Sequence, residues 1–400
     1  MKIRTVIFWL HLTAGVVAGV VVLIMSVTGV LLTYEKQMVA WAERSPLAAP
    51  PSPDAPRLSI ETLVANARQA RPSATPATLT FRANRDEPVS VTLGRDGQVL
   101  LNAYTGVVIG EGATRLRAFF RAVTDWHRWL AATGDYRATG RAITGACNLA
   151  FLVLVVSGAY LWLPKAWTAL QLRNITWFRR GLPGKARDFN WHNSIGFWSC
   201  APLFVVVLSA TVISYPSASN LVYRVVGDEP PASAPGRDSA TAGRPAPQRP
   251  AGPGDGAGGG ARLVDLAGLD SQLARARQQV GAWRTITLRI PTSDTAPVVF
   301  TIDEGSGGQP QKRGTLTLDR ATGAVVKWEP FSRNSLGRRL RTILRFAHTG
   351  EVLGLPGQTI AGIASAGGAV LVYTGLALSL RRFLSWRRRR GVDARQASAA

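Results

Sequence analysis

The sequence has few of the residues that build covalently stabilised or metal-stabilised scaffolds. It contains two cysteines, Cys147 and Cys200, and both lie within apolar runs. Two thiols cannot form a disulfide framework, so we interpret them as small packing residues. The chain has only four histidines and no pair of neighbouring cysteines, which argues against a zinc site of ordinary ligand spacing.

Acidic residues are also scarce. The chain has 24 Asp and Glu against 47 Lys and Arg, which gives a formal net charge of +23. An excess of this size is typical of nucleic-acid-binding proteins. Here, however, 46% of the residues are hydrophobic, and basic residues cluster beside apolar runs, as in the stretch 381–390. We therefore interpret the basic tail as a membrane anchor and topology signal, and we expect no nucleic acid partner.

Four nearly unbroken apolar runs are long enough to cross a hydrocarbon core of about 30 Å. They cover residues 6–33, 142–163, 195–215 and 357–380. The first run has features of a secretory signal, because Lys2 and Arg4 precede it and Ala40-Trp41-Ala42 resembles a cleavage site. Its apolar stretch exceeds the roughly 7 to 15 residues of a signal core, so we predict that it is retained.

Basic residues in the short segments predict the orientation of these spans. Lys2 and Arg4 precede the first span, six basic residues occupy 165–187, and Arg381 follows the last span. Both termini are therefore expected to face the cytoplasm. The two long segments, 35–140 and 216–356, are expected to lie on the opposite, periplasmic side.

The two long outer segments share one plan. In the first, a helical pattern is followed by strand patterns and a turn at Thr105-Gly106; these patterns cover 60–71, 89–93 and 99–104. The second has the same order and a last turn at Thr322-Gly323; its helix covers 263–280 and its strands 285–290, 298–302 and 315–318. Residues 228–262 are dominated by Pro, Gly and Ala and predict a flexible linker.

The histidine spacing indicates an internal duplication. His11 and His192 open the first and third spans, and His127 and His348 precede the second and fourth. The interval from His127 to His348 is longer than the interval from His11 to His192. The excess is close to the length of the linker, which only the second half contains. We therefore predict two halves, each with two spans and one small outer unit.

All four histidines fall at the ends of spans. His11 and His192 are expected near the cytoplasmic ends, and His127 and His348 near the outer ends. A polar side chain at membrane depth needs a partner and is a functional hypothesis by default. The alternative is that each histidine only hydrogen-bonds a neighbouring helix. Because a haem iron takes two axial nitrogens from facing helices, we predict two haem b groups, one for each of these pairs.

Other residues refine this hypothesis. The sequence has no C-x-x-C-H motif, which excludes covalent haem attachment. Haem propionates need cations. The outer candidates are Arg121, Arg128, Arg341 and Arg345, and we favour Arg128 and Arg345 among them. The inner candidates are Arg4, Lys185 and Arg187. Carboxylate pairs, Ser/His/Asp sets, phosphate loops and flavin motifs are missing near these positions, so we expect neither hydrolysis nor nucleotide binding.

At these residues the chain resembles the PepSY-associated transmembrane family, which includes iron-regulated membrane proteins and inner-membrane siderophore reductases. The motifs that carry the resemblance are His11 to Gly15 with Thr28-Gly29, Trp126 to Leu130 with Ser157-Gly158, Trp191 to Gly196, and His348 to Glu351 with Thr374-Gly375. The third span departs from the family, because Ser209-Ala210-Thr211 stands where a Thr-Gly pair is usual. The resemblance implies electron transfer through haem to a ferric complex in the periplasm.

We therefore predict a bacterial inner-membrane protein that passes electrons from an unidentified donor on the cytoplasmic side to a ferric siderophore. Its fold class is an all-α four-helix transmembrane bundle with two small periplasmic α+β units that resemble PepSY domains. One alternative is a membrane-anchored PepSY module that binds a peptide or modulates a protease without catalysis. Another is a siderophore transporter.

The predicted boundaries follow the spans and the two outer units. They are 1–34 for the first span, 35–114 for the first PepSY-like unit, 115–164 for an interfacial helix and the second span, 165–190 for a cytoplasmic loop, 191–216 for the third span, 217–262 for a periplasmic segment with the linker, 263–333 for the second PepSY-like unit, 334–382 for an interfacial helix and the fourth span, and 383–400 for a basic cytoplasmic tail.

Overall fold

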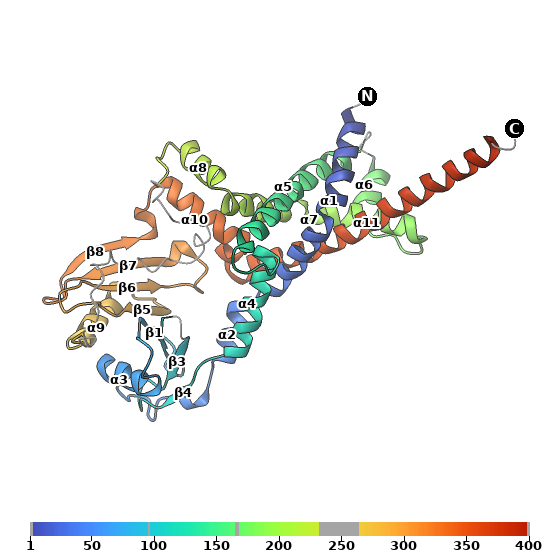
Figure 1. Ribbon diagram of the computed structural model, residues 1–400. Coiled ribbons are helices and arrows are strands. Elements are labelled where there is room, and N and C mark those ends of the chain that lie inside the picture. Colours follow the sequence, from blue (N-terminus) through green and yellow to red (C-terminus); the bar gives the residue numbers. More distant parts are fainter. Residues whose placement is uncertain (1–2, 95–96, 165–167, 232–263, 398–400) are drawn as a thin grey trace. The chain divides into compact units, whose positions relative to one another are not determined.

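The structure is a computed structural model that describes residues 3–94, 97–164, 168–231 and 264–397 (Figure 1). The chain divides into two compact units, each built from segments of both halves of the sequence. The helical unit comprises Met1–Glu35, Phe119–Val222 and Ile343–Ala400, and the sheet unit comprises Lys36–Ala118 and Tyr223–Thr342.

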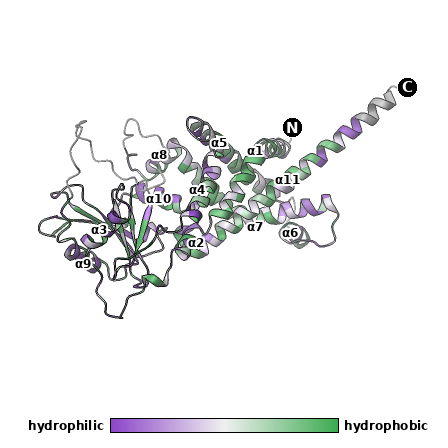
Figure 2. Ribbon diagram, turned by 60° about the horizontal axis from the view of Figure 1, so that its bottom comes forward, coloured by the Kyte–Doolittle hydropathy of each residue, from purple (hydrophilic) through white to green (hydrophobic). Residues whose placement is uncertain are grey.

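Four long helices form the helical unit. They are α1 (Ile3–Leu32), α5 (Tyr136–Trp162), α7 (Gly184–Ser214) and α11 (Gly354–Ala397). Helices α1 and α7 each pack against both α5 and α11, so the four close into a ring. Each contains a stretch long and apolar enough to cross a membrane. Much of these long helices is hydrophobic (Figure 2). Large apolar side chains are exposed, such as Val17 at 78%, as expected for a lipid-facing surface. This is a multi-pass membrane protein.

The long helices extend beyond the apolar runs that predicted them. Helix α7 begins at Gly184 and not near residue 195, and α11 continues to Ala397 through the basic segment predicted as a tail. Hydropathy marks only the part of a helix that lies in hydrocarbon, whereas polar residues can continue the same helix into water. The predicted loop 165–190 likewise contains a short helix, α6 (Ala169–Thr176), and the start of α7.

Shorter helices flank the long ones. Helices α2 (Glu35–Ala42) and α8 (Pro216–Val225) follow α1 and α7, and the amphipathic helices α4 (Thr114–Trp129) and α10 (Leu336–His348) precede α5 and α11. The α4 to α5 turn is tight, because a Cβ on Gly140 would lie 2.2 Å from the carbonyl oxygen of Trp129. In the α10 to α11 turn, a Cβ on Gly357 would lie 2.2 Å from the Gly350 carbonyl oxygen. Only glycine allows backbones to approach this closely.

The sheet unit contains one antiparallel sheet with the strand order β4-β3-β2-β1-β5-β6-β7-β8. The strands are β1 (Thr78–Arg82), β2 (Val89–Thr92), β3 (Gln98–Leu101), β4 (Val108–Gly110), β5 (Thr285–Arg289), β6 (Val298–Asp303), β7 (Arg313–Leu318) and β8 (Val325–Pro330). The two halves of the sequence each contribute four strands and join where β1 pairs with β5. The sequence predicted most of the strands, but it did not predict that both outer units share one sheet.

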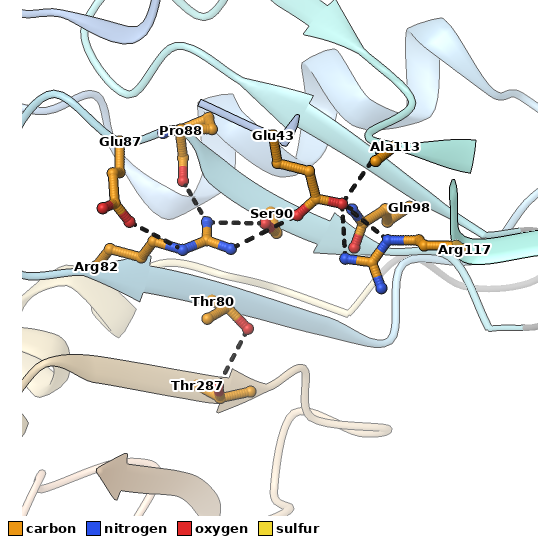
Figure 3. A network of polar contacts seen from close by, with 10 residues as sticks. All are labelled: Glu43, Thr80, Arg82, Glu87, Pro88, Ser90, Gln98, Ala113, Arg117 and Thr287. Carbon is orange, nitrogen blue, oxygen red and sulfur yellow. Dashed lines mark hydrogen bonds and ion pairs between the residues drawn. The ribbon is translucent and has the colours of Figure 1, made fainter. Parts of the chain in front are cut away.

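The β1–β5 junction pairs two similar segments. Strand β1 reads TLTFR and β5 reads TITLR, and Thr80 lies opposite Thr287 with their hydroxyl oxygens 3.1 Å apart (Figure 3). Alternate residues point to opposite faces of a strand. Leu79, Phe81, Ile286 and Leu288 are therefore fully buried, in a core that includes residues of α3 (Ile60–Ala70) and α9 (Leu269–Gln279).

Helices α3 and α9 confirm the predicted helical patterns with somewhat shorter bounds. They also contact each other, since the Asp270 carboxylate accepts a hydrogen bond from the Ile60 backbone N–H at 3.1 Å. This satisfies one free N–H group at the start of α3. Of the predicted linker 228–262, the structure describes Asp228 to Pro231, and the remainder lies outside the described residues.

A buried carboxylate holds the start of α4 in the sheet unit. Glu43 has a side chain only 3% exposed, and it accepts hydrogen bonds from Arg117 at 2.6 Å and Gln98 at 2.7 Å (Figure 3). In the second half, Asp228 accepts a hydrogen bond from the backbone N–H of Gly337, at the start of α10, at 2.5 Å. An acidic residue near a helix N-terminus is favourable because it faces the positive end of the helix dipole. Each amphipathic helix therefore has an acidic partner near its N-terminus, Glu43 through the Arg117 side chain and Asp228 through the Gly337 backbone.

Candidate functional site

The structure brings the four histidines together as two pairs in the helical unit. In the first histidine pair, His11 on α1 and His192 on α7 have ring centres 6.4 Å apart and ring planes at 88°. In the second histidine pair, His127 on α4 and His348 on α10 have ring centres 6.2 Å apart and planes at 49°. All four side chains are half-buried. Each pair takes one histidine from each half of the sequence.

Every imidazole uses its Nδ1 atom in a hydrogen bond to a different helix. The acceptors are Ser157 Oγ for His11 (2.8 Å), Thr374 Oγ1 for His192 (2.9 Å), Thr28 Oγ1 for His127 (2.8 Å) and the Val206 carbonyl for His348 (2.9 Å). Each ring is therefore held in position by an acceptor that does not belong to its histidine pair. Partners of this kind orient histidines that ligate metals.

These contacts determine which ring nitrogen carries the proton. The hydroxyls of Thr28, Ser157 and Thr374 each donate to the carbonyl four residues earlier in their own helix. A hydroxyl has one proton, so these three oxygens accept from the histidines, and a carbonyl can only accept. Each Nδ1 is therefore protonated, so in its neutral form each imidazole carries the lone pair on Nε2. This is the neutral form that binds metal ions.

Burial keeps the second histidine pair neutral. It lowers the pKa of His127 to about 4, and the neighbouring His348 contributes to this lowered pKa. Burial also lowers the pKa of His348, with additional repulsion from Arg345 and Arg128. Desolvation disfavours the charged imidazolium, so both rings are free bases at neutral pH. The two arginines lie near enough to His348 to act on it electrostatically.

A glycine follows each of the three hydroxyl residues and leaves room for the histidine ring. A Cβ on Gly158 would lie 3.3 Å from His11 Cε1, and a Cβ on Gly375 would lie 3.4 Å from His192 Cε1. We call Thr28-Gly29, Ser157-Gly158 and Thr374-Gly375 the hydroxyl–glycine dipeptides. From the sequence, these residues are expected to let helices pack closely or to leave room for a flat macrocycle, and their bonds to the histidines were not predicted. Their repeated Ser/Thr-Gly pattern was the available signal, but the histidine that each one binds lies on another helix.

Comparison with known proteins identifies the family. Residues 8–382 match the PepSY-associated TM region. The chain belongs to this family. The match confirms the resemblance seen in the motifs, and no curated protein matches the chain.

The spacing within each pair fits a shared metal ion in this PepSY-associated protein. Two imidazoles that bind one metal through bonds of about 2.0 Å place their ring centres about 6.3 Å apart. The observed distances of 6.4 and 6.2 Å agree with this value. Among the described residues, no group of three or more His, Cys, Asp or Glu is arranged to bind a metal. The donor set of two imidazoles suits an iron whose remaining ligands come from a macrocycle.

The predicted arginine contacts differ between the two pairs. Arg128 stacks over Trp129 at 4.7 Å, and Arg345 lies over Phe346 at 5.4 Å, both beside the second pair. Arg121 is exposed and Arg341 half-buried, both farther back along the same two helices. These positions leave Arg128 and Arg345 as the better candidates for a propionate.

Near the first pair, two of the three candidate cations already have protein partners. Arg4 donates to the carbonyls of Leu161 and Leu163 at 2.7 and 3.2 Å. Arg187 pairs with Asp188 at 3.1 Å, while Lys185 is exposed.

Sequence reasoning missed one acidic residue beside the first pair. Asp188 is 1% exposed and lies one helical turn before His192 on α7. It forms an ion pair of 2.8 Å with Arg381 on α11, in addition to its contact with Arg187. A buried carboxylate needs such partners, because an isolated charge in a low-dielectric interior is costly. The pair joins α7 to α11 two turns beyond Thr374.

Proposed function

We propose that this protein is a membrane electron-transfer protein that holds one haem b between His11 and His192 and another between His127 and His348. The observation that carries the proposal is the common state of the four imidazoles. Each donates from Nδ1 to another helix, which leaves Nε2 for a metal, and each pair has the ring spacing of a shared metal. A histidine that only links two helices needs no second imidazole at this distance.

Haem, when bound, supplies reversible one-electron transfer. The chain's own residues bind and orient it. The imidazole Nε2 atoms would bind its iron, and three hydroxyls and the Val206 carbonyl fix the tautomer and the direction of the rings. Arg128 and Arg345 offer positive charge for propionates.

The positions of the two pairs support electron transfer across the membrane. His11 and Thr28, which holds His127, are both on α1. They are separated by about five helical turns of about 5.4 Å each, which corresponds to about 25 Å along the helix. This distance is close to the thickness of the hydrocarbon core. We propose a bacterial inner membrane location with cytoplasmic termini, a donor on the cytoplasmic side and an acceptor in the periplasm.

The proposed acceptor is a ferric siderophore. Hard oxygen ligands hold Fe(III) tightly, and the gain of one electron gives Fe(II), for which such ligands have lower affinity. Reduction would thus release iron without hydrolysis of the carrier. The sheet unit, with two helix-plus-four-strand halves, is the proposed pair of periplasmic PepSY-like units. The choice of acceptor follows from the family and not from the geometry of the pairs.

The haem-to-protein ratio of the purified full-length chain tests the proposal. We expect about two haem b per chain, a b-type spectrum after reduction with dithionite, and reoxidation when a ferric siderophore is added. A folded but colourless protein would contradict the proposal and favour a membrane-anchored PepSY module. Siderophore uptake that persists when all four histidines are replaced would favour a transporter.

The hydroxyl–glycine dipeptides give a second test. Thr28→Val keeps the size of the side chain but removes the acceptor for His127 Nδ1–H. Loss of such a partner typically weakens metal binding by about 10-fold to 100-fold, so haem titration should show one weakened site and one normal site. Thr33→Val is the matched control, because the Thr33 hydroxyl donates to the Gly29 carbonyl of α1 and, among the described residues, bonds to no histidine. Equal haem affinity in both variants would show that Thr28 does not support the ligand.

A further inference from the structure

We infer that the two histidine pairs are built to differ electronically, and that Ser209 and Ala210 on α7 set the difference. These residues stand where a fourth hydroxyl–glycine dipeptide would complete the set. The inference rests on the proposed function, since it concerns the haem held by the second pair. It assigns positioning roles to two residues that are not among the proposed haem ligands.

The duplication identifies the position. Ser209 and Ala210 follow Thr28 and Gly29 by the same interval by which His192 follows His11. The local hydrogen bonds are also equivalent. Thr28 donates to the carbonyls of Ile24 and Met25 at 2.6 and 3.1 Å. Its counterpart Ser209 donates to the corresponding carbonyls of Val205 and Val206 at 2.6 and 2.8 Å.

The histidine beside this turn of α7, His348, nevertheless donates to a different kind of acceptor. His127 donates to the Thr28 hydroxyl, but its counterpart His348 donates to the Val206 carbonyl at 2.9 Å. The Val206 oxygen also accepts from the Ser209 hydroxyl. Three imidazoles are therefore held by hydroxyls, and one is held by a main-chain carbonyl in the same turn.

Ala210 gives a physical reason for this shift. A Cβ on Gly29 would lie 3.7 Å from His127 Cε1 and 3.4 Å from Ser365 Oγ. These are ordinary van der Waals distances, so a methyl at the equivalent position, as on Ala210, would touch an imidazole edge that the first half leaves uncovered. Serine also lacks the γ-methyl of Thr28, which limits the rotation of that hydroxyl. We therefore expect His348 to lie nearer to the Val206 carbonyl than to the Ser209 hydroxyl.

The geometry of the pairs differs accordingly. The first pair, held by two hydroxyl–glycine dipeptides, has ring planes at 88°. The second pair, held by one dipeptide and one carbonyl, has planes at 49°. Perpendicular axial rings leave the two π-type d orbitals of a low-spin iron nearly equal in energy, whereas less perpendicular rings separate them. This separation is visible in the EPR spectrum of the oxidised protein.

The acceptor affects the same site in a second way. A carbonyl accepts a hydrogen bond more strongly than a hydroxyl, so it makes the imidazole a stronger electron donor. Stronger donation favours the oxidised metal and lowers the reduction potential, which is one of the second-shell levers that proteins use. Both effects act on the second pair alone.

The test compares the double variant S209T/A210G with the wild-type full-length protein. In the wild type we expect two low-spin EPR signals, one strongly axial and one more rhombic, and two steps in a potentiometric titration. In the variant, the rhombic signal should move toward the axial one, and one potential should rise while the other stays unchanged. The reverse exchange, T28S/G29A, should move the same signal further from the axial type and lower the same potential.

Two controls make the result decisive. Gly375→Ala crowds His192 in the first pair and should alter only the axial signal. The single variant A210G is the milder change and should shift the rhombic signal in the same direction as the double variant. If A210G and S209T/A210G retain two haems with unchanged signals and potentials, the inference is wrong while the proposed function stands. A wild-type protein without haem would overturn both.

Discussion

Replacement of His127 by alanine is expected to remove one of the two haem groups and to leave the other in place. The imidazole is one of only two protein ligands in the second pair, and His348 alone cannot complete the axial coordination. Haem content should therefore fall to about half of the wild-type value. Pyridine haemochrome analysis against protein concentration measures the change directly.

The reciprocal variant His11→Ala serves as the matched control. It should also halve the haem content, but the remaining haem should have the spectrum and potential of the second pair. The double variant of His11 and His127 should be colourless. If His127→Ala retained both haem groups with unchanged potentials, the second pair would not be a haem site.

Gly140→Ala is expected to disrupt the second pair without touching either histidine. The added Cβ would lie 2.2 Å from the carbonyl oxygen and 3.0 Å from the carbonyl carbon of Trp129. These are backbone atoms, so the turn between α4 and α5 must move, and His127 lies only two residues before Trp129. Overpacking of this kind destabilises proteins by about 1–3 kcal/mol or more. We expect a lower melting temperature and weakened haem binding at one site.

The same substitution elsewhere in the bundle gives the control. Gly15→Ala on α1 would place its Cβ 3.6 Å from Leu154 Cδ2, the flexible end of a side chain, and should leave both haem sites and the melting temperature nearly unchanged. Gly357→Ala, at the start of α11 beside the turn from α10, should reproduce the Gly140→Ala defect. A Gly140→Ala protein with wild-type haem content and stability would contradict this account of the turn.

The sequence predicted the spans and the histidine pairs because both leave local or periodic signals. Long apolar runs identify membrane helices by themselves, although they underestimate α7 and α11, whose polar ends continue as helix. The positions of the histidines at the cytoplasmic or the outer ends of the spans predicted which of them would meet, and the offsets between them predicted the duplication. The iron that we expect between them remains a prediction.

Sequence patterns did not predict two features of the structure. The pairing of β1 with β5 joins segments that are far apart in the chain, and alternation of apolar residues says nothing about which strand will be the neighbour. The hydroxyl acceptors were also missed. Ser157 binds a histidine 146 residues away, and Thr374 binds one 182 residues away, so neither contact has a local signature.

The β1–β5 junction has a consequence for how such a chain could have arisen. Corresponding residues of the two halves, Thr80 and Thr287, face each other across an antiparallel pair, and this is the form that self-complementary contacts take in twofold-symmetric dimers. Within the helical unit, each imidazole likewise pairs with an imidazole from the other half of the sequence. Two molecules of a half-length precursor could make all of these contacts, so fusion of two gene copies would keep an existing assembly and free each copy to diverge.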